Sequence, residues 1–140
     1  YLVPDNSPLQ TIEDVDQPGV RIAVSDRAAY DLYPTRTLQH AELHRGKGLI
    51  GAFELFETEK LDALAGLVPA LKKNAETLPG SRLLAGRFTS VRQAFGTKPE
   101  NAALKAIIEH FISEAKESGL VAELLKNHGV KGKLQVASGS

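Results

Sequence analysis

A turn of polar and small residues follows the apolar run from Val20 to Val24, and it carries the best candidates for chemistry. Its residues are Ser25, Asp26, Arg27, Ala28, Ala29 and Tyr30. A strand followed by a helix would place this turn at a helix N-terminus, where backbone N–H groups lack partners and the helix dipole is positive. A guanidinium there can bind a carboxylate or phosphate. The turn predicts contacts to a polar or anionic ligand; the alternative is that Arg27 is a solvated surface residue.

Two other places would line the same crevice, because ligands of open α/β sheets bind beyond the carboxyl ends of the strands. Gly66 and Leu67 end a second apolar run and would form an apolar floor, or else an ordinary strand-to-helix turn. Arg87 and Phe88 precede an extended segment and would face the crevice. Tyr30 lies one turn into the expected helix, a position more typical of packing than of ligand contact.

Catalytic and metal chemistry are not indicated by the spacing of the reactive residues. No grouping of Ser, His and Asp and no carboxylate pair emerges, so neither a catalytic residue nor a cofactor is predicted, and the protein is expected not to be an enzyme. His40 and His44 have a spacing that suits a metal only on a helix, but Ala41 to His44 alternates like a strand, so no metal site is predicted. Cysteine is absent, which excludes disulfides and thiolate metal sites.

The composition is that of an ordinary globular domain: of 140 residues, 42% are hydrophobic and 24% are charged. Lys plus Arg and Asp plus Glu both number 17, so the net charge is zero and gives no electrostatic reason to expect nucleic acid or an anionic membrane as partner. No apolar run approaches the roughly 20 residues that span a bilayer. The chain opens on Tyr1-Leu2-Val3-Pro4, without Met, and is expected to be a segment of a longer protein.

Strands and helices alternate from residue 20 to residue 85, which indicates βαβ units with helices on both faces of a parallel sheet. Strands are predicted over residues 1–3, 20–24, 41–44, 61–66 and 82–85. A helix capped by Ser25 or Asp26 is expected to run to about Gln39, with Pro34 kinking it or limiting it to a loose first half. Further helices are predicted over 49–60 and 67–77. The predicted fold class is α/β, with a mostly parallel sheet flanked by helices.

The end of the chain differs, because two helices follow each other with no strand between them. The first begins at Pro99 and stops at Gly119, and the second runs to about His128. The first helix has an apolar stripe of Leu104, Ile107, Ile108, Phe111, Ile112 and Ala115. The pair is expected to pack on a separate surface. The predicted division is therefore 1–95 and 96–140, with the boundary at residues 96–98.

Several short motifs occur in a fixed order over nearly the whole chain: Gly19-Val20-Arg21-Ile22-Ala23-Val24, Ala29-Tyr30-Asp31-Leu32, Leu61-Asp62-Ala63-Leu64-Ala65-Gly66, Pro79-Gly80-Ser81-Arg82, Gln93-Ala94-Phe95-Gly96 and Ala115-Lys116-Glu117-Ser118-Gly119-Leu120-Val121-Ala122. Their order and spacing resemble bacterial extracellular solute-binding proteins of family 3. These proteins are the substrate-binding components of ABC uptake systems for amino acids and other small polar solutes.

The resemblance implies a periplasmic-binding-protein-like lobe from a protein with two lobes that hold the ligand between them. This chain would be the second lobe with both inter-lobe crossover segments, at residues 1–3 and 89–95. The helices from Pro99 to His128 would be C-terminal helices, which normally pack on the first lobe, and most of that lobe would lie outside this chain. The resemblance also implies a small-molecule solute, ABC permease subunits as partners, a location in the bacterial periplasm and hinged closure of the lobes.

Two departures from the family pattern concern the ligand. Amino-acid binders carry Gly-Thr or Gly-Ser in the turn after the first strand of this lobe, where this chain has Arg27 and Ala28. They also carry an Asp just after the third strand, which pairs with the ligand ammonium, where this chain has Leu67. The resemblance with these departures implies a ligand other than a standard α-amino acid.

Two other functions fit the same fold. One is a ligand-sensing domain of a receptor kinase or of a transcription regulator, which the rest of the parent chain would decide. The other is an enzyme such as a dehydratase of cyclohexadienyl acids, which needs a catalytic acid that this half of the site does not offer. As an isolated segment, the chain is predicted to form a homodimer or a domain swap that covers Ile107, Ile108, Phe111 and Ile112.

Overall fold

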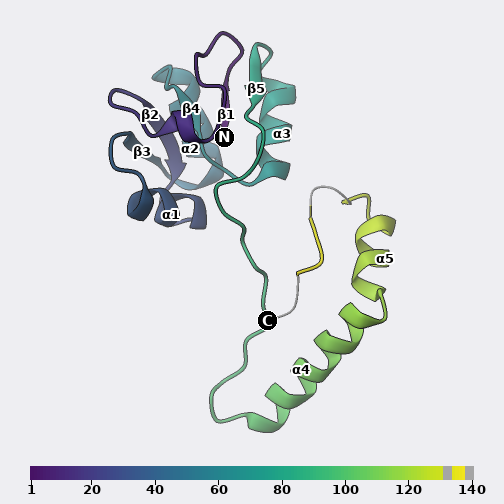
Figure 1. Cartoon of the computed structure of the whole chain (residues 1–140). Helices are drawn as coiled ribbons and strands as arrows, with labels where there is room; N and C mark the ends of the chain where they lie inside the picture. Colours follow the sequence, from purple (N-terminus) through teal and green to yellow (C-terminus); the bar gives the residue numbers. More distant parts are fainter. Residues whose placement is uncertain (131–133, 138–140) are drawn as a thin grey trace. The chain divides into compact units, whose positions relative to one another are not determined.

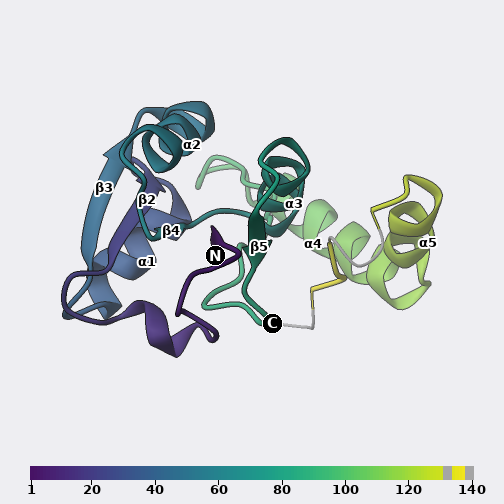
Figure 2. The ribbon, with the colours of Figure 1, turned by 90° about the horizontal axis from the view of Figure 1, so that it is seen from above.

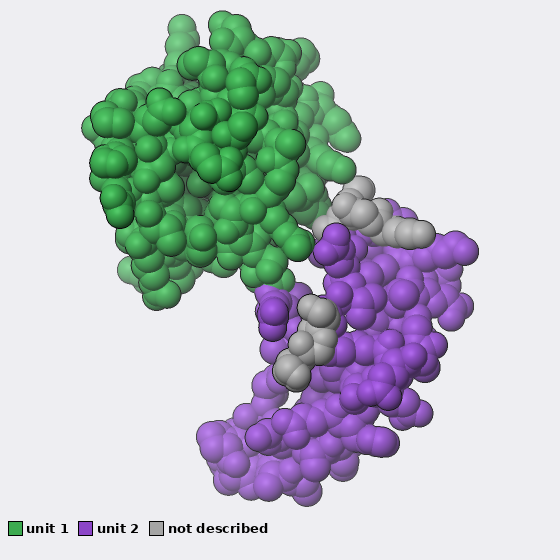
Figure 3. All heavy atoms as spheres, viewed as in Figure 1, with its two compact units in different colours: residues 1–91 green, residues 92–140 purple. Residues whose placement is uncertain are grey.

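A computed structural model describes residues 1–130 and 134–137 of the chain. The chain divides into two compact units, residues 1–91 and residues 92–140, which Figure 3 shows in different colours. No helix in the described part is long and apolar enough to cross a membrane.

Unit 1 alternates strands and helices, as the sequence predicts, and the predicted α/β fold class is confirmed (Figure 1). Its elements are β1 (Leu2–Pro4), the 3-10 helix η1 (Glu13–Val15), β2 (Arg21–Ser25), α1 (Ala29–Thr37), β3 (Glu42–Gly46), α2 (Gly48–Thr58), β4 (Ala63–Leu64), α3 (Val68–Thr77) and β5 (Ser81–Leu83).

The five strands form one mixed sheet in the order β3-β2-β4-β1-β5. Strand β2 is parallel to both neighbours, with Ala23 opposite His44 on β3 and Leu64 on β4. Figure 2 shows these three strands side by side. Strand β1 is antiparallel to β4 and to β5. The carboxyl ends of β2, β3 and β4 therefore lie at the same end of the sheet. We call this end, where the strands finish, the carboxyl edge. Because β1 runs the other way, its first residue lies at this edge too.

Side chains alternate between the two faces of the sheet, and both faces are buried. One core cluster contains Ile22 and Val24 from β2, and residues of the segment around η1 pack into it. The other contains Ala23 from β2 and Leu64 from β4, covered by residues of α2 and α3. Because both faces of the sheet are buried, a ligand can reach its polar backbone groups only where the strands end or along the outermost strands.

Several predicted boundaries were wrong. Neither Ser25 nor Asp26 caps the first helix, because α1 begins at Ala29 with Ala28 as its N-cap. Pro34 does not end this helix: α1 continues to Thr37, and the proline removes only the hydrogen bond to the carbonyl four residues earlier. Only residues 63–64 of the predicted strand over 61–66 pair in the sheet. The segment 89–95 adopts neither strand nor helix.

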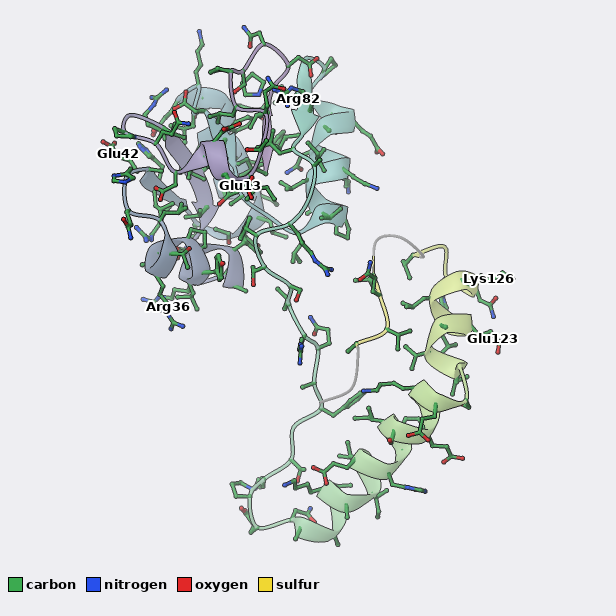
Figure 4. All side chains as sticks on the ribbon, viewed as in Figure 1. Glu13, Arg36, Glu42, Arg82, Glu123 and Lys126 are labelled. Atoms are coloured by element: carbon green, nitrogen blue, oxygen red, sulfur yellow. The ribbon has the colours of Figure 1, made fainter. Side chains whose placement is uncertain are left out.

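Arg82 anchors the loop that follows β1, at the edge opposite the carboxyl edge (Figure 4). Its guanidinium donates hydrogen bonds to the carbonyls of Asp5, Ser7 and Leu9 at 3.4, 3.1 and 2.7 Å. The side chain satisfies three backbone acceptors that have no strand partner, so it fixes the path from the sheet into the segment around η1.

Asp16 organises the loop between α1 and β3, and it predicts a pH effect. Its carboxylate accepts N–H groups of His40, Gln39 and Ala41 at 2.8, 3.0 and 3.1 Å. These bonds, that of His40 first, hold the pKa of Asp16 below its ordinary value. A lowered folded pKa gives stability that is present above the unfolded pKa of about 4 and is lost as the pH falls through the folded value.

We therefore expect Asp16→Asn to lose stability relative to the wild type above about pH 5, with the difference shrinking on acidification. Thermal unfolding of both proteins from about pH 3 to pH 7 measures it. A difference in melting temperature that stays constant over this range would contradict the role of the charge. Asp5→Asn is the matched control, because the side chain of Asp5 makes no hydrogen bond among those found in the described residues.

Unit 2 contains two helices, α4 (Ala102–Glu117) and α5 (Leu120–Asn127), joined at Gly119 in the left-handed conformation, with φ of 80°. The helices pack on each other, and Ala115 of α4 is buried. The apolar stripe predicted on α4 is present but partly exposed to solvent: Ile107 is 65% exposed and Phe111 is 58% exposed. Nothing within the described part of unit 2 covers these two side chains.

Candidate functional site

The predicted site residues come from segments that reach the carboxyl edge. The turn Ser25 to Ala28 follows β2, and Gly66 and Leu67 follow β4, the parallel neighbour of β2. Arg87 and Phe88 follow β5, beyond Leu84, whose N–H donates to the Tyr1 carbonyl at 2.9 Å. The topology therefore brings the three predicted places to one edge of one sheet.

Backbone hydrogen bonds hold the turn after β2 in a tight conformation. The Asp26 N–H donates to the Gly46 carbonyl at 3.0 Å, which ties the turn to the end of β3. The Ala28 N–H donates to the Ser25 carbonyl at 3.1 Å. Between them, Arg27 has φ of 59°, in the left-handed region that residues with a Cβ seldom adopt. This backbone strain lies where the sequence predicts a ligand contact, a combination that is typical of functional sites.

Asp31 holds the strained turn in place, and sequence reasoning missed it. Asp31 is 3% exposed, and its carboxylate accepts the Arg27 N–H at 2.8 Å. It also accepts Nε of Arg45 at 3.1 Å and the hydroxyl of Thr35 at 3.1 Å, and Arg45 donates to that hydroxyl at 2.9 Å. The available signal was an acid in the first turn of a helix, where it can reach back to an unpartnered N–H group.

The carboxylate of Asp31 accepts the N–H of Arg27, which precedes the N-cap Ala28, so it does not cap the first amides of α1. The N-cap residues of α1 and α3 are Ala28 and Leu67, and neither helix has a side-chain capping hydrogen bond. The first amides of both helices are therefore left without a side-chain acceptor at the carboxyl edge. An anionic group placed there would meet N–H donors and the positive ends of two helix dipoles.

The predicted site residues differ in their exposure. Asp26, Arg27, Ala29, Leu67 and Arg87 are exposed, Ala28, Gly66 and Phe88 are partly buried, and Ser25 and Tyr30 are buried. The Arg27 side chain is 89% exposed and forms an ion pair with Asp26 at 3.7 Å. Such an exposed pair is weak, so its guanidinium can exchange partners at little cost.

Phe88 is held by aromatic packing. Its ring stacks on Tyr1 with centroids 4.6 Å apart and lies 5.7 Å from the ring of Tyr33 on α1. The packing fixes the segment that follows β5 against the first residue of the chain. Arg87, the neighbour of Phe88, is thereby kept near the carboxyl edge.

The two histidines with helical spacing lie in different elements. His44 is on β3, where Nδ1 is 3.2 Å from a carboxylate oxygen of Glu59, and His40 lies in the loop before β3. No cluster of three or more His, Cys, Asp or Glu side chains that would hold a metal occurs in residues 1–130 and 134–137.

The conformation of Arg27 predicts a substitution that stabilises the protein. The left-handed conformation costs a residue with a Cβ about 1–2 kcal/mol, and glycine adopts it freely but loses more entropy on folding. We expect Arg27→Gly to raise the free energy of unfolding by about 0.5 kcal/mol. Arg27→Ala is the control, because it removes the same guanidinium but keeps the Cβ. Equal unfolding free energies for the two variants in chemical denaturation would show that no strain is stored there.

Comparisons with known proteins identify a fold. No family model and no curated protein matches the sequence. A mutant of ArgBP from T. maritima is 20% identical, with a TM-score of 0.68 over 90% of this chain and 55% of its own. The amino acid ABC transporter substrate-binding protein AbpA from Streptococcus pneumoniae, bound to L-arginine, is 18% identical, with a TM-score of 0.65 over 96% of this chain and 57% of its own.

An enzyme is also among the similar structures. An ancestral cyclohexadienyl dehydratase is 18% identical, with a TM-score of 0.55 over 90% of this chain and 54% of its own. The chain thus spans little more than half the length of each of these three proteins. At these identities the likeness shows a shared fold, which is the one used by substrate-binding proteins of amino acid ABC transporters.

Proposed function

We propose that this chain is the second lobe, with both inter-lobe segments, of a periplasmic solute-binding protein. The protein would capture a small polar or anionic solute, an amino acid or a related compound, and deliver it to the permease subunits of an ABC transporter. Residues 1–95 would form the lobe and its crossovers, and residues 96–140 the C-terminal helices. The likeness of fold to amino acid ABC transporter proteins carries the proposal.

The geometry of the carboxyl edge supports a ligand site there. The turn after β2, the turn after β4 and the segment after β5 meet at this edge, and two helices begin there without side-chain caps. The proposed contacts are the residues from Ser25 to Tyr30 together with Gly66, Leu67, Arg87 and Phe88. Buried Ser25 and Tyr30 would contribute shape and backbone groups, whereas exposed Arg27 would contribute charge.

The arrangement of the two proposed inter-lobe segments supports hinged closure. Tyr1 and Leu84 are joined by a backbone hydrogen bond of 2.9 Å, and the rings of Tyr1 and Phe88 stack. Two connections that leave a lobe side by side allow rotation about one axis, which is the geometry of a hinge. Ligand would then stabilise the closed state through its higher affinity for that state.

The buried carboxylate beneath the proposed site is committed to structure, which supports binding without catalysis. Asp31 accepts three hydrogen bonds, and exposed Asp26 forms a weak ion pair with the guanidinium of Arg27. A general acid needs a proton that it can donate to a bound substrate. Neither group is placed for this role, so we propose that the protein is not an enzyme.

Thermal unfolding of the full-length protein with candidate solutes tests the proposal. The panel contains amino acids, carboxylates and polyamines, because a ligand that binds the folded protein raises its melting temperature by mass action. A rise with at least one solute, reduced by Arg27→Ala, is expected. The absence of any rise over the whole panel would contradict solute binding.

For the isolated chain we propose self-association through α4. Ile107 and Phe111 are exposed and lie beside the partly buried Ile108 and Ile112. Together they form an apolar surface whose contact with water is unfavourable. Solution scattering is expected to give a dimer or a domain-swapped pair. Ile107→Glu should shift the oligomeric state to monomer, whereas Lys126→Glu, at an exposed position of α5, should leave it unchanged. A monodisperse wild-type monomer would contradict this expectation.

A further inference from the structure

Exposed apolar side chains border the carboxyl edge next to the Arg27 turn. Leu67 is 42% exposed and Val68 is 38% exposed. Leu67 is the N-cap of α3 and Val68 its first residue, with Ala65 and Gly66 between them and β4. Leu67 and Val68 lie outside the two core clusters. Water-exposed leucine and valine at the start of a helix contribute nothing to capping, since neither can accept a hydrogen bond there. Their place at this edge is explained if they contact something apolar.

The cation of the site lies in the turn beside them. Strands β2 and β4 are hydrogen-bonded neighbours, and the Ala65 N–H donates to the Ala23 carbonyl at 2.9 Å. Neighbouring strands are about 5 Å apart, so the turns that follow them flank each other. One turn presents the guanidinium of Arg27, and the other presents Leu67 and Val68.

The turn that presents Leu67 and Val68 contains no acidic residue, since Gly66 and Pro69 flank them. Asp31 is buried under the Arg27 turn, and Asp26 belongs to that turn, where it pairs with Arg27 at 3.7 Å. A ligand ammonium placed against Leu67 and Val68 would lose its water without gaining a partner, which is costly. An uncharged apolar group in the same place would gain by burial.

We propose, on the premise of the proposed function, that the solute is a carboxylate with an apolar, uncharged body. The carboxylate pairs with the guanidinium of Arg27, and the body packs on Leu67 and Val68. Leu67 is then a specificity-determining residue, which excludes an ammonium group from this side of the ligand.

Ligand pairs that differ only in the α-amino group test the proposal in the full-length protein. Phenylpropanoate is compared with phenylalanine, and isocaproate with leucine, by titration calorimetry. The carboxylate without the amino group is expected to bind about tenfold tighter or more in at least one pair. Amino acids that bind as tightly as their partners would overturn the proposal.

Substitution of Leu67 tests its role separately. Leu67→Asp should keep the fold, because Asp is a favoured N-cap residue. It should reduce or reverse the preference for the carboxylate that lacks the amino group in each ligand pair. Leu32→Asp is the matched control: Leu32 is 45% exposed on α1, and its substitution should leave the preference unchanged. An unchanged preference in Leu67→Asp would overturn the assignment of Leu67.

The outcomes separate this proposal from the proposed function. The protein could bind a polyamine, or another solute without a carboxylate, and bind neither the carboxylates nor the amino acids of the ligand pairs. This result would overturn the proposed ligand class and leave solute binding in place. Binding of no solute at all would overturn both.

Asp26→Asn should tighten binding of the carboxylates, because it removes the acidic group that competes for Arg27. Weaker binding would place the ligand against Asp26 and overturn the arrangement.

Discussion

Substitution Gly46→Ala is expected to destabilise unit 1 by about 3 kcal/mol or more, enough to unfold a marginally stable domain. Gly46 ends β3 at the carboxyl edge, where the backbone of α2 crosses directly over it. A Cβ at this position would overlap the backbone of Gly51 and Ala52 and would lie 2.5 Å from Cα of Ala52. Backbone atoms cannot rotate away as a side chain can, so the helix would have to leave the sheet.

Gly51→Ala is the matched control for this prediction. It adds the same methyl group from the other side of the same contact, and the nearest atom to that Cβ is 3.5 Å away. Gly51 lies inside α2, where alanine is favoured over glycine by about 0.5–1 kcal/mol. We expect this variant to be as stable as the wild type or more so. Urea unfolding measures both, and similar losses in the two variants would contradict close backbone packing at Gly46.

The second large effect is expected from Asp31→Asn, with a loss of about 2–3 kcal/mol. The carboxylate accepts from Arg27, Thr35 and Arg45, and the asparagine amide would turn one acceptor into a donor that faces these donors. The group is almost fully buried, so water cannot replace the lost bonds. The turn after β2 would then lose the contact that holds Arg27 in its left-handed conformation.

Asp26→Asn controls for the general effect of removing a carboxylate from this turn. Asp26 is exposed and makes one weak ion pair, so its substitution is expected to change stability by less than about 0.5 kcal/mol. Hydrogen exchange at the Arg27 amide is the second measurement, because only loss of the Asp31 acceptor exposes that amide. A protected Arg27 amide in Asp31→Asn would contradict the proposed role of the carboxylate.

The order of strands and helices could be predicted from the sequence because it rests on local patterns. Apolar runs such as Ile22 to Val24 are buried on both faces, and turn residues separate them from helical stretches. The position of β1 between β4 and β5 could not be predicted, since no local signal identifies partners as distant as Leu64 and Leu83. The start of α1 was misplaced because neither Ser25 nor Asp26 caps the helix; Asp31, inside the helix, instead holds the turn by accepting the Arg27 N–H.

The meeting of the candidate site residues at one end of the sheet was predictable, and the local construction of that end was less so. Parallel strands end at the same edge, so the turns after β2 and β4 had to lie together once the strands were recognised. The conformation of Arg27, the burial of Asp31 and the close approach at Gly46 depend on contacts between segments that are distant in sequence. The sequence names the residue types, whereas their roles depend on three-dimensional packing.

The place of β1 between β4 and β5 has a consequence for how unit 1 folds. Leu2 pairs with Leu64 and with Leu83, so the first strand must wait for partners separated from it by nearly the whole unit. Such long-range pairing raises the contact order and slows folding. Within unit 1, β1 precedes both of its partners: one side can pair once β4 is available, and the other stays open until β5 is available. Unit 1 is therefore expected to be vulnerable to aggregation through the open edge of β1 until β5 has paired with it.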